Sequence, residues 1–122
     1  MIDLSKIKTI AVVGASNNQS KFGNKIVKNL MARGFEVYPV NPREEEIEGL
    51  KSFASIKDLP AVPDLVDLVV RAEVGLGVVE EAIEIGVKNI WVQPGAESDE
   101  IVELLNSYSE INSVSQSCIM LN

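Results

Sequence analysis

The sequence predicts an α/β fold of the Rossmann-like, doubly wound type, in which helices cover both faces of a parallel sheet of about five strands. Its short apolar runs are continuous instead of alternating, which is typical of parallel strands buried on both faces. Segments with helical spacing of apolar residues separate these runs, and strands that alternate with helices form parallel sheets. The length of 122 residues fits one domain, which we expect to span residues 1–122.

Five segments are predicted to be strands, of which the first four are strongly apolar and the last is weaker. They cover Thr9–Val13, Glu36–Val40, Leu65–Val70, Asn89–Gln93 and Asn112–Ser115. Numbered along the chain, these strands are expected to take the order 3-2-1-4-5, which is common among Rossmann folds.

Three helices are predicted between the strands because apolar residues recur there with helical spacing. They cover Phe22–Arg33, Val74–Ile85 and Asp99–Tyr108. Gly34 and Gly86 follow the first two and are typical helix stops, while Ser98 is a good N-cap for the third.

The stretch from Arg43 to Asp64 is rich in charge, glycine and proline, and it is predicted to hold one or two short helices. Glu44–Glu46 is interpreted as a solvated helix start. Ser55, with Asp58 three residues later, predicts a short capped turn before Pro60.

Composition excludes several classes of function. The formal net charge of −7 argues against binding to nucleic acid or to an anionic membrane. The sequence has no histidine and one cysteine, so we expect no zinc site and no internal disulfide, and a reducing cytoplasm is the simplest location. We find no signal peptide, and the apolar runs are too short to span a bilayer.

The loop after the first strand is the main candidate site, because ligands of doubly wound sheets lie beyond the carboxyl ends of the strands. It runs from Gly14 to the start of a helix at Phe22, where free backbone amides and the helix dipole can bind an anion. Ser16 and Ser20 add hydroxyl groups, and Lys21 adds a positive charge. The alternative is a plain connection in which Gly14 makes the turn and Lys21 is solvated. We favour a phosphate site, since loops at this position usually bind a ligand.

Two departures from dinucleotide-binding motifs narrow the choice of ligand. Position 16 is serine, so the pattern Gly-x-Gly-x-x-Gly is absent, and no acid follows the second strand to bind a ribose diol. That strand ends in Val40-Asn41-Pro42-Arg43 instead, which argues against NAD. Arg43 is placed to meet a ribose phosphate, which both NADP and coenzyme A carry. A Gly-Lys-Ser/Thr phosphate loop is also absent.

Several short motifs resemble one family over nearly the whole chain. They are Gly14-Ala15-Ser16, Lys21-Phe22-Gly23, Tyr38-Pro39-Val40-Asn41-Pro42, Gly49, Leu59-Pro60, Asp67-Leu68 and Gly86-Val87. They are similar to the coenzyme A-binding domain of the succinyl-CoA synthetase alpha subunit and of ADP-forming acyl-CoA synthetases. The sequence resembles most closely the stand-alone CoA-binding domain proteins of bacteria and archaea.

The resemblance implies a set of cofactor-binding residues. The loop Gly14–Lys21, with Ala15, Ser16 and Ser20, and the helix start Phe22-Gly23 would hold the phosphates of coenzyme A. Val40, Asn41, Pro42 and Arg43 would line the adenosine side, while Val70, Arg71, Gln93, Pro94 and Gly95 would flank the pantetheine. All these segments lie at the carboxyl ends of predicted strands, which is where ligands of doubly wound sheets bind.

The expected function is therefore binding of coenzyme A or an acyl-CoA without catalysis by the chain alone. The synthetases that it resembles use a phosphorylated histidine on further domains, and this sequence has none. One alternative is a subunit of a split acyl-CoA synthetase. Others are an NADP-binding, oxidoreductase-like domain and an interaction domain without a ligand. The acyl group, a protein partner and a homo-oligomer are left open.

Two further residues carry expectations. Cys118 lies in an apolar tail and is predicted to be a buried, inert thiol. The alternative places it near the pantetheine end, where it could form a mixed disulfide with coenzyme A. Trp91, on the fourth predicted strand, is expected to fill the core.

Overall fold

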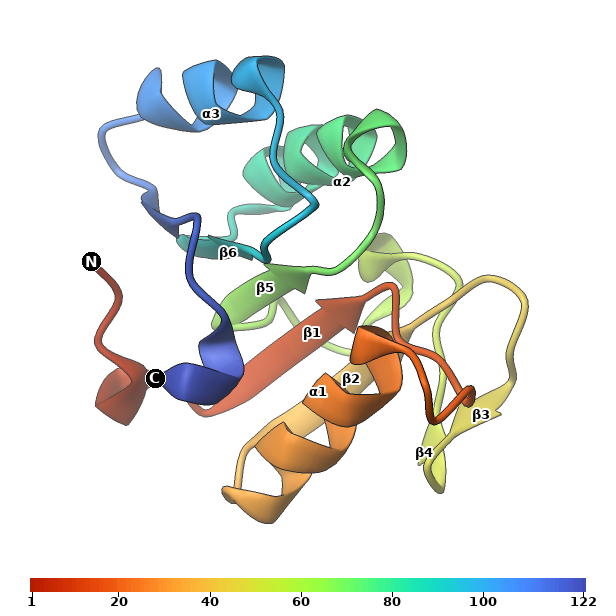
Figure 1. The fold of residues 1–122 in the computed structure, drawn as a ribbon. Coiled ribbons are helices and arrows are strands. Elements are labelled where there is room, and N and C mark those ends of the chain that lie inside the picture. The colour runs from red at the N-terminus through yellow and green to blue at the C-terminus, as the bar shows by residue number, and fades with distance from the viewer.

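A parallel sheet of five strands forms the centre of the molecule, with α1 on one face and α2 and α3 on the other (Figure 1). The computed structural model describes all residues, 1–122. The sheet strands are β1 (Thr9–Val13), β2 (Glu36–Val40), β5 (Leu65–Leu68), β6 (Asn89–Val92) and β7 (Asn112–Val114). The α-helices are α1 (Phe22–Ala32), α2 (Ala72–Ile85) and α3 (Asp99–Asn106). The predicted fold class is confirmed.

The order of the strands differs from the predicted order. The sheet runs β2-β1-β5-β6-β7, which is 2-1-3-4-5 when only these five strands are counted. The predicted order 3-2-1-4-5 is wrong because β5 pairs with β1, from Ile10 with Leu65 to Val13 with Leu68, and not with β2. All four residues of β5 are buried, which suits a strand at the centre of the sheet.

The outer edge of β2, where the third strand was expected, is occupied by the segment around Phe53. The Phe53 N–H donates to the Pro39 carbonyl at 3.0 Å, and the Asn41 N–H donates to the Phe53 carbonyl at 2.9 Å. The edge of β2 is therefore covered before the chain crosses to the far side of β1.

Asp64 fixes the start of β5 beside the start of β1. Its carboxylate accepts the N–H groups of Lys8 at 2.8 Å and Thr9 at 3.1 Å, and its own N–H donates to the Thr9 hydroxyl at 2.8 Å. The N–H donors of Lys8 and then Thr9 hold the pKa of Asp64 below its usual value. These hydrogen bonds join residues more than 50 positions apart, which periodicity alone does not reveal.

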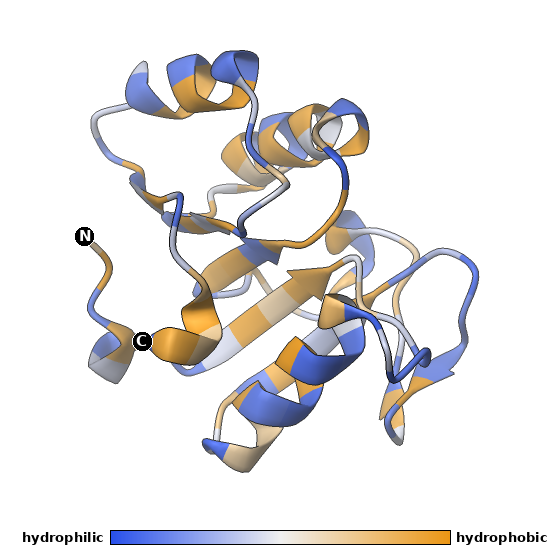
Figure 2. Cartoon of the chain, in the orientation of Figure 1, coloured by the Kyte–Doolittle hydropathy of each residue, from blue (hydrophilic) through white to orange (hydrophobic).

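The sheet divides the core into two layers. Figure 2 shows apolar stretches of the helices turned toward the sheet, with hydrophilic stretches on their outer sides. In α1 the buried stripe includes Ile26, Val27 and Leu30, while Lys25 and Lys28 are exposed. Burying each such apolar side chain contributes about 1.5–3 kcal/mol. Trp91 is 2% exposed and donates its indole N–H to the Ser117 carbonyl, so its core position is confirmed.

Helix ends follow the predicted signals closely. Gly34, two residues after α1, and Gly86, directly after α2, have φ of 91° and 92°. The Ser98 hydroxyl accepts the Ile101 N–H at 3.2 Å at the start of α3. The longest helix, α2, has 14 residues, and no helix is long and apolar enough to cross a membrane.

The stretch 43–64 forms a small hairpin followed by one short 3₁₀ helix, so the prediction of one or two short helices holds only for its second half. Its strands are β3 (Glu46–Ile47) and β4 (Leu50–Lys51), so Glu44–Glu46 does not begin a helix. The Ile47 side chain is fully buried and anchors the hairpin on the α1 face of the sheet. The capped turn predicted at Ser55 is confirmed as the 3₁₀ turn η2 (Ile56–Asp58), with the Ser55 hydroxyl accepting the Lys57 N–H.

Candidate functional site

A cavity of about 920 Å³ lies at the carboxyl ends of β1, β2, β5 and β6. Its volume is near the upper end for small-molecule sites, so it suits a ligand of cofactor size. Of the predicted site residues, those that line it are Gly14, Ser20, Lys21, Phe22, Gly23, Val40, Asn41, Pro42, Arg43, Val70, Arg71, Gln93, Pro94 and Gly95. The fold thus brings together four segments that are far apart in the sequence.

Two predicted residues, Ala15 and Ser16, lie outside this lining. The Ala15 side chain is fully buried in the core layer on the α1 side. The Ser16 hydroxyl accepts the Asn18 N–H at 3.0 Å and so shapes the loop. Both residues therefore shape the loop and do not line the cavity.

Close packing of two glycines sets the floor of the cavity. Gly14 has φ of 101°, and a Cβ atom there would lie 3.0 Å from the Val69 carbonyl carbon and from Val70 Cγ1. A Cβ atom on Gly23 would overlap the Gly14 carbonyl oxygen. The first turn of α1 can therefore rest directly on the end of β1 only because both residues are glycine.

Two helices begin at the cavity without a side-chain cap. The N-cap residues are Lys21 for α1 and Arg71 for α2, and neither side chain makes a capping hydrogen bond. The N–H groups of Phe22 and Gly23 find no acceptor in the protein. Free amides at the positive end of a helix dipole favour an anion.

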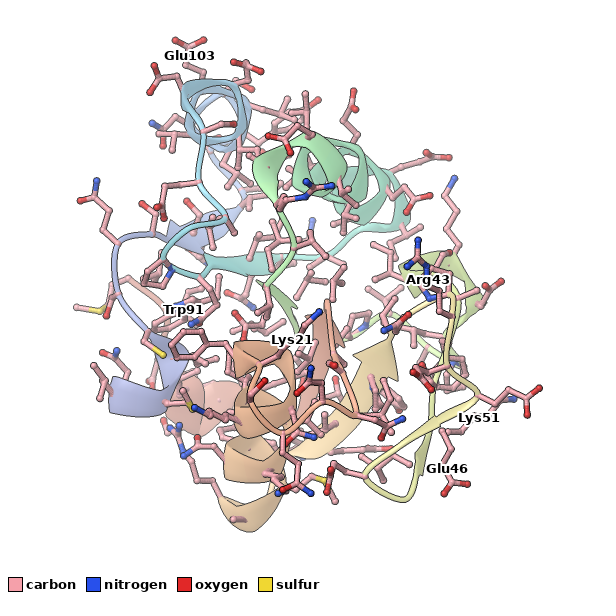
Figure 3. All side chains as sticks on the ribbon, turned by 45° about the vertical axis from the view of Figure 1, so that its right-hand side comes forward. Lys21, Arg43, Glu46, Lys51, Trp91 and Glu103 are labelled. Carbon is pink, nitrogen blue, oxygen red and sulfur yellow. The ribbon has the colours of Figure 1, made fainter.

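Positive side chains outnumber negative ones around the cavity, although the whole chain is acidic. Lys21, Arg43 and Arg71 line it, against the single carboxylate of Glu81. Figure 3 shows Lys21 at the start of α1 and Arg43 on the connection after β2. Arg71 also lies 3.8 Å from Glu73, but both side chains are highly exposed, so this ion pair is weak.

The Ser20 hydroxyl is already engaged within the loop. It donates to Asn18 Oδ1 at 2.7 Å, and the Ser20 N–H donates to the same oxygen at 3.0 Å. A hydrogen bond from this hydroxyl to a ligand would need that contact to be exchanged.

Sequence reasoning missed the part of the lining that comes from α2 and η2. Val74, Val78 and Glu81 follow helical spacing along one side of α2, and Ser55 and Ile56 come from the turn opposite. Val74 is 51% exposed and lines the cavity, so its side chain is open to contact with a ligand there. The helical spacing was visible in the sequence, but which side of α2 faces the cavity depends on how the helix packs on the sheet.

Cys118 is not the buried thiol of the main prediction. It is half-buried and lines the cavity beside Gln93, whose side-chain N–H donates to the Cys118 Sγ atom at 3.2 Å. Gln93 also accepts the Ile119 N–H at 3.0 Å. The buried amide of Gln93 therefore ties the C-terminal tail to the end of β6.

Fold and site together define a Rossmann-like domain with a cofactor-sized, cation-lined cavity at the carboxyl edge of its sheet. Residues 8–122 match the family model described as a CoA binding domain. The chain belongs to this family of CoA-binding domains.

Relatives occur both as parts of longer enzymes and as short proteins. The chain is 37% identical over 110 residues to the alpha subunit of an ADP-forming acetate–CoA ligase II from Pyrococcus furiosus, a match that covers 81% of this chain and 24% of that subunit. It is 33% identical to the protein YneT of Bacillus subtilis, with 84% of this chain and 76% of that protein covered. The chain thus spans about a quarter of the ligase subunit.

A solved structure agrees with the fold over almost its full length. A conserved hypothetical protein from Pyrococcus furiosus superposes with a TM-score of 0.88 and is 48% identical, covering 93% of this chain and 97% of that one.

Proposed function

We propose that this chain binds coenzyme A or an acyl-CoA in the cavity, with the phosphates on the loop after β1, and that it does not catalyse acyl-CoA formation alone. The observation that carries the proposal is the meeting of two uncapped helix N-termini with Lys21, Arg43 and Arg71 in one cavity. Membership of the CoA-binding domain family supports the identity of the ligand.

The lining residues suggest which part of such a ligand lies in which part of the cavity. Lys21 and the amides of Phe22 and Gly23 suit the diphosphate, and Arg43 suits the ribose phosphate. The segment from Val40 to Pro42 suits the adenosine side. Apolar walls at Val70 and Val74 suit the extended, weakly polar pantetheine arm.

The proposal that the chain alone does not catalyse rests on which side chains it has. The sequence has no histidine, so neither a phosphohistidine relay nor a histidine base is available. The similar ligase subunit is about four times longer. A second candidate is therefore that this chain supplies the CoA site of a larger assembly, which the name of that relative, a ligase subunit, favours.

Ligand preference tests the proposal directly. We expect calorimetry to show coenzyme A binding at least about tenfold more tightly than NAD, because Arg43 can pair with a ribose phosphate that NAD lacks. The affinity for coenzyme A should fall as salt is raised, since exposed charges are screened. Equal or tighter binding of NAD would contradict the proposal, and NADP binding as tightly as coenzyme A would favour an NADP-binding domain.

Removal of single positive charges locates the anion. Lys21→Ala and Arg43→Ala should each weaken coenzyme A binding by about 1–3 kcal/mol, the range for a charge-assisted hydrogen bond, without changing the thermal midpoint. Lys28→Ala is the matched control, because Lys28 is exposed on α1 and lies outside the cavity lining. Unchanged affinity in both cavity variants would place the anion elsewhere.

A further inference from the structure

Glu48 occupies a backbone conformation that its residue type disfavours. It is the first residue of the two-residue turn between β3 and β4, with φ of 49°, and Gly49 follows with φ of 80°. Turns with two positive φ values favour Asn, Asp or Gly at the first position. For other residues this left-handed region costs about 1–2 kcal/mol. The turn alone would therefore favour asparagine over glutamate.

The Glu48 side chain makes a contact that a shorter residue would not reach. Its Oε2 atom accepts the Nδ2–H of Asn24 at 2.8 Å. Asn24 is fully buried in the first turn of α1, and its Nδ2 also donates to the Ser16 carbonyl at 2.9 Å. One buried amide thus joins the tip of the hairpin to the loop after β1.

A second asparagine reinforces this link. Asn17 Nδ2 donates to the Glu46 carbonyl at 2.8 Å and to Glu44 Oε2 at 3.2 Å, and Asn17 Oδ1 accepts the Glu48 N–H at 3.4 Å. On the other side of the loop, Asn41 Nδ2 donates to the Ala15 carbonyl at 2.9 Å. The hairpin, the end of β2 and the loop are held as one unit.

These contacts fix the direction of the loop peptides. The carbonyls of Ala15 and Ser16 are held by Asn41 and Asn24, and in a trans peptide the N–H points away from the carbonyl. The N–H groups of Ser16 and Asn17 belong to these two held peptides, point away from their carbonyls, and find no acceptor in the protein. Free backbone N–H groups on peptides that are held in place can bind an anion.

We propose that Glu48 is a positioning residue for the anion loop: through Asn24, its carboxylate holds the segment Gly14–Gly23 in the binding conformation before a ligand arrives. This inference rests on the proposed function only for the identity of the ligand. The strain at Glu48 is offset by the order that its side chain imposes on the loop.

The test separates the side chain from the turn. Glu48→Asn and Glu48→Gly suit the turn but lose the contact with Asn24, whereas Glu48→Gln keeps an acceptor oxygen. Glu45→Asn is the matched control, because Glu45 is exposed and its side chain makes no hydrogen bond. For each purified variant, amide hydrogen exchange of residues 15–21 is measured without ligand, and coenzyme A affinity is measured by calorimetry.

Glu48→Asn and Glu48→Gly should raise loop exchange and weaken coenzyme A binding, each by about tenfold, with no decrease in thermal midpoint. Losing the negative charge of Glu48 would by itself strengthen binding of an anionic ligand. A weaker affinity in these variants would therefore point to loss of the positioned loop. Glu48→Gln and Glu45→Asn should match the unmodified chain or bind slightly more tightly.

Two results would overturn the positioning role. One is loop exchange that stays unchanged in Glu48→Asn and Glu48→Gly. The other is Glu48→Gln behaving like Glu48→Asn, which would show that the hydrogen bond to Asn24 is not the cause. If the unmodified chain fails to bind coenzyme A, the proposed function fails, and the exchange measurements alone still decide the role of Glu48.

Discussion

Replacement of Gly23 by alanine is expected to abolish measurable binding of coenzyme A and to destabilise the protein by about 2–4 kcal/mol. The new Cβ atom would overlap the backbone carbonyl oxygen of Gly14, which cannot rotate away as a side chain can. The first turn of α1 must then move off the end of β1, and its free amides leave the cavity. Denaturant unfolding and calorimetry measure the two effects.

Gly77→Ala in α2 is the matched control for this substitution. A Cβ atom at Gly77 has nothing within 4 Å, so alanine there should stabilise the helix by about 0.5–1 kcal/mol and leave binding unchanged. A Gly23→Ala protein with normal stability and affinity would refute the close approach between α1 and β1.

Substitution of Asp67 is expected to change how stability depends on pH. Asp67 lies on β5, paired in register with Val12 and Trp91, and is fully buried with no hydrogen-bond partner for either carboxyl oxygen. Burial raises the pKa of Asp67 well above its usual value of 3.8. The folded chain therefore keeps this proton at pH values where the unfolded chain has lost it.

The sign of the effect follows from proton linkage. Between the usual pKa and the raised pKa the folded state binds more protons, so the free energy of unfolding falls by about 1.4 kcal/mol for each pH unit gained. Asp67→Asn should remove this slope, matching the unmodified chain near pH 4 and exceeding its stability at pH 7 and above. Denaturant unfolding from pH 4 to 9 measures both curves.

Asp64→Asn provides a control of opposite sign. The pKa of Asp64 is lowered by the N–H groups of Lys8 and Thr9, so its carboxylate stabilises the fold above its usual pKa and loses that effect as pH falls. Asp64→Asn should therefore be less stable than the unmodified chain at pH 7. Parallel pH curves for Asp67→Asn and the unmodified chain would show that Asp67 is not held neutral.

Local patterns predicted the elements well because their causes are local. The ranges of β1 and β2 agree with the predicted ranges, and the end signals at Gly34 and Gly86 operate within one turn of their helices. The strand order was not predictable in this way. The order depends on the Phe53 segment, which covers the edge of β2, and on Asp64, which joins β5 to β1. Both contacts are made by hydrogen bonds between residues far apart in the sequence.

Most of the candidate site was nevertheless predictable, for a reason independent of that order. Carboxyl ends of parallel strands meet at the same edge of a sheet whichever strand lies beside which. The loops that follow Val13, Val40, Leu68 and Val92 therefore lie at one edge in either arrangement, although only the observed order places Val70 against Gly14. The residues that were missed, such as Val74 and Glu81, come from the side of a helix, whose direction only tertiary packing sets.

The central place of β5 also governs when the cavity can exist as the chain folds. Ile10 pairs with Leu65, so closing this contact brings together residues 55 positions apart, and such non-local pairing is slow compared with helix formation. Gly14 leans on Val69 and Val70, directly after β5, so the loop has no wall behind it until that strand is in place. A fragment that ends before β5 can contain the whole loop Gly14–Lys21 and still lack the residues that close the cavity behind it. The cavity therefore requires the assembled sheet, and a ligand that binds only the folded chain stabilises the sheet as a whole.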